Sequence, residues 1–184
     1  MSANPNHSAV IDRRYRVRAG VAFGSNIGDR LANLIAARKK ISEIPGVNPP
    51  VISSPVYETD PVGCEPGAAG FLNAVIEFPY AGEPLELFGQ LKQIEIELGR
   101  PAEHARNVSR SIDIDLLYFG DTVLNTEHLS LPHPRMVDRV FVLQPLADIQ
   151  PERVLPSQTK TVRELLASAA QTGKVERATV QWEG

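Results

Sequence analysis

Short apolar-rich stretches and longer amphipathic stretches follow one another along the chain. Residues 17–23 carry apolar side chains at every second position, which is the period of a half-buried β-strand. Three further short stretches are also typical of strands, and two longer ones repeat their apolar residues with helical spacing. The predicted elements, in chain order, are a strand at 17–23, a helix that stops near residue 45, strands at 51–57 and 71–78, a helix from 84 that ends at Gly99, and a strand at 112–119.

This order of elements predicts an α+β fold. Strand, helix, strand, strand, helix, strand is the ferredoxin-like βαββαβ core, an antiparallel sheet with two helices on one face. A C-terminal extension follows, with a short helix expected at 162–170 and with Trp182 expected to pack on the surface. Residues 1–16 show no apolar period and are expected to form a disordered tail, so that residues 17–184 make up a single domain.

Composition and charge exclude several classes of protein. The 184 residues suffice for one domain, and 19 Lys and Arg against 22 Asp and Glu leave a net charge of −3. This mild negative charge argues against a basic nucleic-acid-binding domain. The single cysteine, Cys64, excludes an internal disulfide framework and a multi-cysteine zinc site. With no apolar run of membrane-spanning length and no apparent secretory signal, we expect a cytoplasmic protein.

An acidic pair marks the last predicted strand, in RSIDIDLLYFG at 110–120. Alternation along a strand places Asp113 and Asp115 on one face, about 7 Å apart at their Cα atoms. The same alternation puts Leu117 and Phe119 on the acidic face and, on the core face, Ile112, Ile114, Leu116 and Tyr118. Two like charges on one face repel, and divalent cations that also bind phosphate oxygens would offset this cost. A solvent-facing strand end explains the pattern equally well.

A second charged feature lies in the apolar stripe of the second predicted helix. At 100° per residue, Glu95 falls inside this stripe, so its carboxylate is either buried with a partner or reaches water at the margin. Arg100, Arg106 and Arg110 flank the loop that leads into the acidic strand. Arginines beside an acidic pair suit a site for polyphosphate and metal ions, whereas charge balance on a surface loop is the alternative.

Other phosphate-binding signals are weak. Neither a P-loop nor a dinucleotide-binding glycine motif is present in the sequence. The turn from Gly24 to Gly28 either binds an anion at a helix N-terminus or only caps that helix. His133, held between two prolines, either donates to a phosphate or is polar surface.

Five ordered segments of the chain resemble the 6-hydroxymethyl-7,8-dihydropterin pyrophosphokinase (HPPK) family. They are FGSNIGD at 23–29, SPVYETDPVG at 54–63, FLNAVIE at 71–77, RSIDIDLLYFG at 110–120 and LPHPRMVDRVFVLQPLADI at 131–149. The resemblance implies an enzyme of folate biosynthesis that transfers pyrophosphate from ATP to 6-hydroxymethyl-7,8-dihydropterin, releases AMP and uses two Mg²⁺ ions. ATP and the pterin are then the partners of an expected monomer, with no nucleic acid and no membrane.

The resemblance also implies roles for individual residues. The metal ligands are Asp113 and Asp115, which act in catalysis together with the phosphate-contacting Arg100 and Arg110. The residues expected on the ATP side are Glu95, Arg106, Ser130, His133 and Arg139. The residues expected around the pterin are Thr59, Pro61, Val62, Phe71, Asn73 and Phe141. Among these, Asn73 would hydrogen-bond the edge of the ring, and Phe71 and Phe141 would stack on it.

The loop before the acidic strand departs from the family pattern. The family often carries RWGPR where this chain has RNVSR at 106–110, and Ala102 stands where an arginine is usual. The loop from 100 to 111 lacks apolar periodicity, and we expect a mobile lid that holds the pterin more loosely than the phosphates. The alternative function is a catalytically impaired pterin- or nucleotide-binding module of the same fold.

Overall fold

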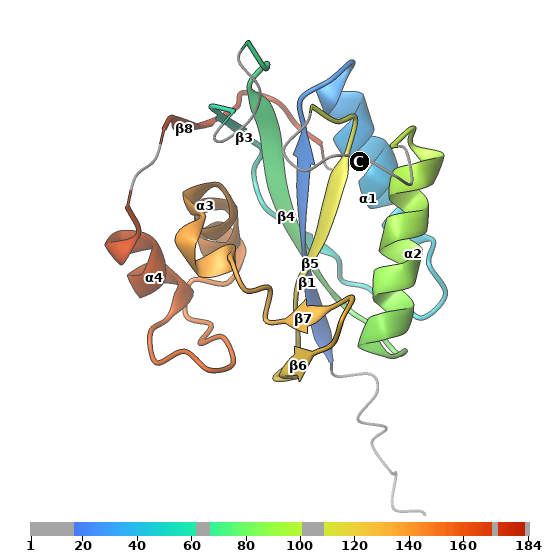
Figure 1. Cartoon of the computed structure of the whole chain (residues 1–184), viewed down its shortest axis with the longest axis vertical. Helices are drawn as coiled ribbons and strands as arrows, with labels where there is room; N and C mark the ends of the chain where they lie inside the picture. The colour runs from blue at the N-terminus through green and yellow to red at the C-terminus, as the bar shows by residue number, and fades with distance from the viewer. Residues whose placement is uncertain (1–16, 62–66, 101–108, 171–172, 183–184) are drawn as a thin grey trace, which may run out of the picture.

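An antiparallel sheet lies between two layers of helices in the computed structural model, which describes residues 17–61, 67–100, 109–170 and 173–182 (Figure 1). The strands are β1 Arg18–Ser25, β2 Ile52–Ser53, β3 Tyr57–Thr59, β4 Phe71–Pro79, β5 Asp113–Phe119, β6 Leu124–Asn125, β7 Ser130–Leu131 and β8 Val175–Arg177. The helices are α1 Arg30–Ser42, α2 Pro84–Glu97, α3 Val140–Ile149 and α4 Val162–Ser168, with a 3₁₀ turn at Met136–Asp138. The predicted strand at 51–57 is divided into β2 and β3, whereas the short helix expected at 162–170 is confirmed as α4.

The order of strands brings distant segments of the chain to one end of the sheet. The large sheet runs β5–β1–β4–β3–β8, with β2 also paired to β4, and its neighbouring strands are antiparallel. Gly24 on the central strand β1 lies opposite Asn73 of β4 on one side and Asp113 of β5 on the other. A residue expected at the pterin and an expected metal ligand therefore flank the same glycine.

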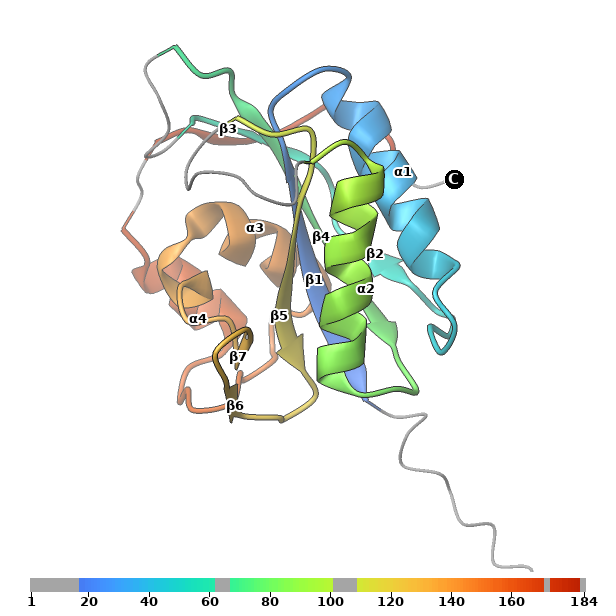
Figure 2. The same cartoon turned by 45° about the vertical axis from the view of Figure 1, so that its right-hand side comes forward.

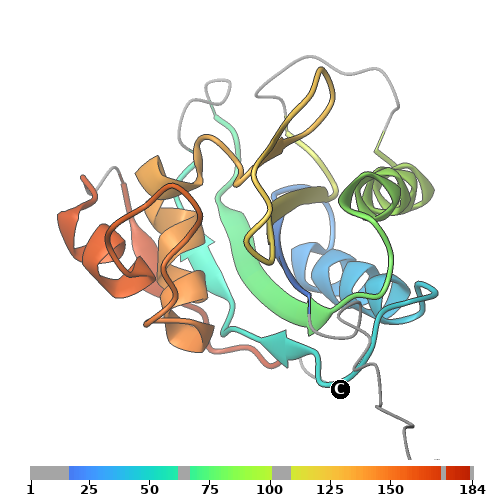
Figure 3. The ribbon, with the colours of Figure 1, turned by 90° about the horizontal axis from the view of Figure 1, so that it is seen from below.

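Helices cover both faces of the sheet, not only one. α1 and α2 lie side by side on the first face, where they enclose the larger apolar core (Figure 2). α3 and α4 lie on the opposite face, as the view from below shows (Figure 3), over a second core that includes Leu143 and Leu146. α3 was not predicted, because Pro145 within it interrupts the helical pattern. Burial of the apolar side of α3 offsets the backbone hydrogen bond that this proline removes.

A β-bulge in β5 changes the expected faces of its last residues. The pairing with β1 passes from Leu116 to Tyr118, so Leu117 is left as the extra residue. Tyr118 therefore packs with Leu117 against α3, and Phe119 packs in the core under α1 and α2. The predicted faces of Tyr118 and Phe119 are wrong for this reason. Gly20 makes room for the reoriented ring, since a Cβ there would lie 2.3 Å from the Tyr118 side chain.

The C-terminal segment also differs from expectation. β8 pairs with β3 at the edge of the sheet, and Trp182 beyond it is only 3% exposed. The indole meets the Phe23 ring edge to face, with 5.5 Å between the ring centroids. The prediction that Trp182 packs on the surface is therefore wrong. The expected tail at 1–16 lies outside the described residues, and no helix in the described ranges is long and apolar enough to cross a membrane.

Candidate active site

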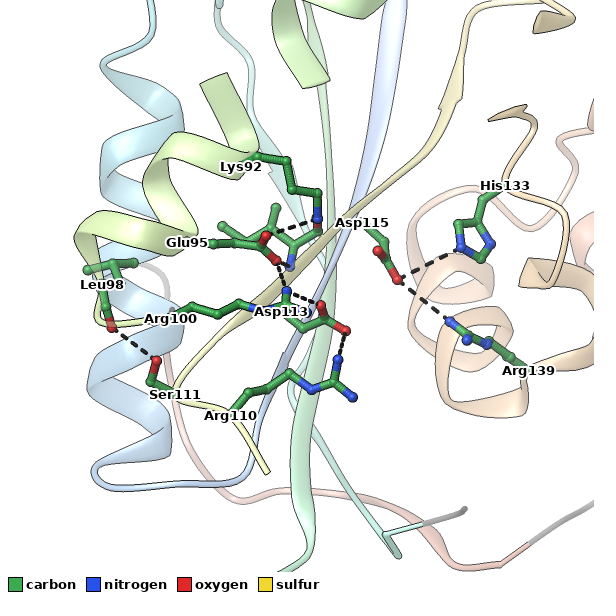
Figure 4. A network of polar contacts seen from close by, with 11 residues as sticks. Lys92, Glu95, Leu98, Arg100, Arg110, Ser111, Asp113, Asp115, His133 and Arg139 are labelled. Atoms are coloured by element: carbon green, nitrogen blue, oxygen red, sulfur yellow. Dashed lines mark hydrogen bonds and ion pairs between the residues drawn. The ribbon is translucent and has the colours of Figure 1, made fainter. Parts of the chain in front are cut away.

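Asp113 stands at the start of β5 between two arginines (Figure 4). Its Oδ1 accepts from Arg100 Nη1 at 2.5 Å, and its Oδ2 lies 3.0 Å from Arg110 Nη1. Burial alone would raise the pKa of Asp113, but the positive charges of Arg110 and Arg100 outweigh it and the pKa is lowered. The carboxylate is therefore charged at neutral pH and is held by two cations.

Glu95 contributes a buried carboxylate to this cluster. It is 3% exposed on the inner side of α2, forms an ion pair with Arg100, and accepts a hydrogen bond from the Ile114 amide at 2.6 Å. Burial raises its pKa, although the neighbouring charges of Lys92 and Arg100 oppose the rise. The alternative in which Glu95 is buried with a partner is thus confirmed. Lys92, which the sequence did not single out, lies 3.0 Å from Glu95 Oε2.

Asp115, two residues further along β5, faces a different pair of side chains. His133 Nε2 lies 4.0 Å and Arg139 Nη1 3.6 Å from its Oδ2. Burial lowers the pKa of His133 in spite of the opposing charge of Asp115. The segment that carries His133 is fastened to the bulge of β5, because the His133 amide donates to the carbonyl of Leu117 at 2.7 Å. The bulge therefore helps to place the second cluster.

The turn after β1 holds the segment before β5 in place, a role that the sequence did not indicate. Asn26, 4% exposed, accepts from the Arg110 amide with its Oδ1 at 2.7 Å and donates to Ser109 Oγ at 3.0 Å. Asp29 is the N-cap of α1, since its Oδ1 accepts from the Ala32 amide at 3.0 Å. The turn thus caps a helix, as one interpretation held, and also clamps the backbone from which the Arg110 side chain reaches Asp113.

The residues expected around the pterin lie on the strands beside Asp113. Asn73, 5% exposed, donates from Nδ2 to Thr59 Oγ1 at 2.7 Å. A Cβ on Gly24 would come within 3.2 Å of Asn73 Oδ1, so glycine lets the two strands present this amide. The Phe71 ring lies 5.8 Å from the guanidinium of Arg110. The expected pterin and phosphate residues are therefore adjacent.

The remaining predicted residues are less closely tied to these clusters. The Phe141 ring lies 5.5 Å from the Arg139 guanidinium, which connects it to the Asp115 cluster. Ser130, on β7, donates to Asn125 Oδ1 at 3.0 Å, and within the described ranges no hydrogen bond joins it to the other predicted residues. Pro61 follows β3 and is partly exposed. The predictions for Val62, for Arg106 and for residues 101–108 of the expected lid lie outside the described residues.

The two carboxylates can interact with more than their present partners. Their side chains are 24% and 29% exposed, so water or a ligand reaches both. Carboxylate oxygens are the ligands that Mg²⁺ prefers, and the guanidinium groups beside them suit phosphate oxygens. No group of three or more potential metal-ligating side chains occurs among the residues that the structure describes.

Comparison with known proteins identifies the family. The model of the 7,8-dihydro-6-hydroxymethylpterin-pyrophosphokinase (HPPK) family matches residues 20–151. The 2-amino-4-hydroxy-6-hydroxymethyldihydropteridine pyrophosphokinase of Bacillus subtilis (strain 168) is 46% identical over 131 residues, which are 71% of this chain and 77% of the relative. The Pseudomonas aeruginosa protein of the same name is 36% identical over 160 residues, 87% of this chain and 96% of the relative. The chain belongs to the HPPK family.

Solved structures show the same fold at low sequence identity. An HPPK-DHPS in complex with substrates has a TM-score of 0.63 at 15% identity, over 83% of this chain and 43% of the solved chain. A Plasmodium falciparum HPPK-DHPS triple mutant has a TM-score of 0.65 at 17% identity, over 82% of this chain and 44% of the solved one. This chain therefore spans less than half the length of these two solved chains.

Proposed function

We propose that this protein transfers the terminal pyrophosphate of ATP to the hydroxymethyl group of 6-hydroxymethyl-7,8-dihydropterin, with release of AMP, in folate biosynthesis. The observation that carries the proposal is the pair of charged clusters on β5, in a chain of the HPPK family. Each cluster combines an acid, which can hold a metal, with arginine, which can hold phosphate.

The residues on β5 fit magnesium. Asp113 and Asp115 are partly exposed carboxylates on one strand face. Among the described residues, the cations that pair with them are Arg100 and Arg110 at Asp113 and Arg139 at Asp115. The two aspartates would hold two Mg²⁺ ions, which when bound neutralise charge on the phosphate oxygens. The solvent-facing interpretation of the acidic pair loses support, because both side chains are engaged and more than two-thirds buried.

The arginines would orient the phosphates. Arg100 and Arg110 pair with Asp113 in this structure, and their five-donor guanidinium groups would also suit phosphate oxygens. Glu95 would keep Arg100 in place through their buried ion pair. Arg139 and His133 would contact the nucleotide from the other side of Asp115. Ser130 and Arg106 stay predictions for the ATP side.

The pterin would bind beside these phosphates. The Asn73 amide and the Thr59 hydroxyl form one buried hydrogen-bonded unit, which can meet the polar edge of a flat ring. Phe71 and Phe141, each near an arginine, would stack on the ring. Pro61 and Val62 would complete the pocket. A hydroxymethyl group held here would lie next to Asp113, whose strand neighbour Gly24 is also the neighbour of Asn73.

The proposal extends to the fold type, the oligomeric state and the location of the enzyme. The order β5–β1–β4–β3, with α1 and α2 on one face, supports a ferredoxin-like βαββαβ core to which α3 and α4 are added. A monomeric state, a cytoplasmic location and a single domain over residues 17–184 stay predictions. An impaired binding module is less well supported, because Arg110, Asp113 and Asp115 are all in place.

Pterin-dependent release of AMP tests the proposal. The purified protein is incubated with ATP, Mg²⁺ and 6-hydroxymethyl-7,8-dihydropterin, and AMP is measured with and without the pterin. Intact pterin binding without AMP release would indicate the impaired module instead.

Three aspartate variants test the assignment of metal ligands. Asp113→Asn and Asp115→Asn should each lower kcat by about 100-fold or more, because each removes a charge needed to stabilise the transferring phosphates. Asp121→Asn, at a side chain 99% exposed in the turn after β5, is the matched control and should leave kcat unchanged. Unfolding curves of all three variants separate turnover from stability. Near-normal kcat in either site variant at saturating Mg²⁺ would show that the assignment is wrong.

A further inference from the structure

A C-terminal segment covers the outer edge of β3. Residues 173–182, here called the C-terminal strap, include β8, whose Val175 lies opposite Thr59 and whose Arg177 lies opposite Tyr57 (Figure 1). The Ala178 amide donates to the Val56 carbonyl at 2.8 Å, which extends the pairing by one bond. Because β3 has only three residues, it depends on partners on both edges to keep its position.

Trp182 fastens the far end of the strap. Its Nε1 donates to the Ser54 carbonyl at 2.7 Å, so the buried indole has its hydrogen bond satisfied. The ring packs edge to face on Phe23 of β1, and the Arg38 guanidinium of α1 lies 5.8 Å from its centroid. The strap is therefore attached to the sheet along β3 and, through Trp182, at Ser54 and Phe23.

Both attachments end next to the residues proposed for the pterin. β3 carries Thr59, whose hydroxyl is the hydrogen-bond partner of Asn73. Phe23, the contact of Trp182, immediately precedes Gly24, which lies opposite Asn73. The arginine and aspartate clusters, in contrast, are carried by β5, α2 and the segment at the start of α3. Displacement of the strap would therefore shift Thr59 and Asn73 more than it shifts the arginine and aspartate clusters.

We propose that the C-terminal strap sets the position of Thr59 and Asn73, and that Trp182 is a positioning residue for the pterin substrate. The proposal rests on the proposed function, since it names the substrate of that site. It concerns a part of the chain that lies beyond the residues 20–151 matched by the family model. The physical reason is that β3 is short. Without β8 and the Trp182 contacts, only β4 would pair with it.

Steady-state kinetics of three variants test the role of Trp182. Trp182→Ala should raise the KM for the pterin about five- to tenfold, the effect of misaligning one hydrogen bond. The KM for ATP and the kcat should stay within about twofold of wild type, because within the described part of the chain the strap does not contact the arginine and aspartate clusters. Trp182→Phe keeps an aromatic ring against Phe23 and should restore most of the pterin KM. Gln181→Ala, at the exposed neighbouring residue, is the matched control and should behave as wild type. Equal increases in both KM values would overturn the proposal.

A fourth variant releases the strap without changing Trp182. Ala178→Pro removes the amide that donates to the Val56 carbonyl. It tests the role of the strap even if Trp182→Ala fails to fold. Trp182 is the only tryptophan of the chain, so a red shift of its emission reports that the strap has detached. A red shift together with a raised pterin KM supports the proposal. A red shift with an unchanged pterin KM overturns it.

Hydrogen exchange distinguishes this proposal from the proposed function. A protein without pterin-dependent AMP release contradicts the function, whatever the strap does. Amide exchange at Tyr57–Thr59 needs no turnover, and in Trp182→Ala it should be at least about tenfold faster than in wild type, as for loss of roughly 1.4 kcal/mol of local stability. Unchanged exchange at β3 in this variant would show that the strap does not hold the strand.

Discussion

Replacement of Glu95 by glutamine tests how far one buried carboxylate organises the arginines of the site. The Glu95 carboxylate, 3% exposed, meets three donors: the Ile114 amide at 2.6 Å, Lys92 Nζ at 3.0 Å and Arg100. Glutamine has nearly the same shape and keeps one carbonyl oxygen. It loses the negative charge, however, and its NH₂ group turns two donors toward cationic neighbours.

The expected loss of stability follows from burial. Removal of one partner from a buried ion pair costs about 3–5 kcal/mol, because the other charge stays buried without compensation. Arg100 still has Asp113 as a second partner, and the glutamine oxygen can still accept from Ile114. We therefore expect the low end, about 3 kcal/mol, for Glu95→Gln. In a domain of this size that corresponds to a fall in Tm of roughly 6–12 °C.

Glu97→Gln provides a closely matched control. Glu97 is at the C-terminal end of the same helix and also pairs with a lysine, Lys40, at 2.7 Å, but its side chain is 43% exposed. Exposed pairs contribute little to stability because water solvates both charges. Urea unfolding at pH 7, followed by circular dichroism, should leave Glu97→Gln close to wild type and shift Glu95→Gln strongly. Equal shifts in the two variants would refute the argument from burial.

Two further substitutions separate binding from stability. Asn73→Ala should weaken pterin binding by about 1–3 kcal/mol, because polar edges of the ring would be buried without a partner, and should leave ATP binding unchanged in calorimetric titrations. Equal losses for both ligands would instead assign Asn73 to structural support. Glu77→Leu should lower the free energy of unfolding by about 3 kcal/mol, since Glu77 is fully buried and accepts from Tyr118 at 2.6 Å and from Arg18. Its kcat and KM values should match wild type, because Glu77 lies four residues along β4 from Asn73; a specific loss of pterin affinity would contradict this.

Elements with a strong local pattern could be predicted from the sequence. The two helices and the four strands of the core follow from apolar spacing and from glycine and proline at the turns. The common face of Asp113 and Asp115 also follows from spacing alone, because both lie in one strand upstream of the bulge. Glu95 within an apolar stripe indicated a buried charge, but two of its partners could not be named, because the Ile114 amide comes from β5 and Arg100 lies beyond the end of α2.

Features that depend on distant neighbours could not be predicted. The bulge at Leu117 is visible only in the register with β1, and it reverses the faces of the two residues that follow. The side chain of Asn26 gives no local sign that it will hold the backbone of Arg110, 84 positions further along the chain. In α3, the proline weakens the local signal for a helix that the second core stabilises.

Local patterns in the sequence suffice for the order of the core elements, for the acidic pair on one strand face and for the charged residue inside an apolar helix stripe. Each depends on the spacing of neighbours within one element, which backbone geometry converts directly into a shared face. The cations around each aspartate, the cover of the sheet by the second helix layer and the burial of Trp182 become visible only in the folded chain. These depend on contacts between segments far apart in the chain, whose energies arise only when the sheet brings the segments together.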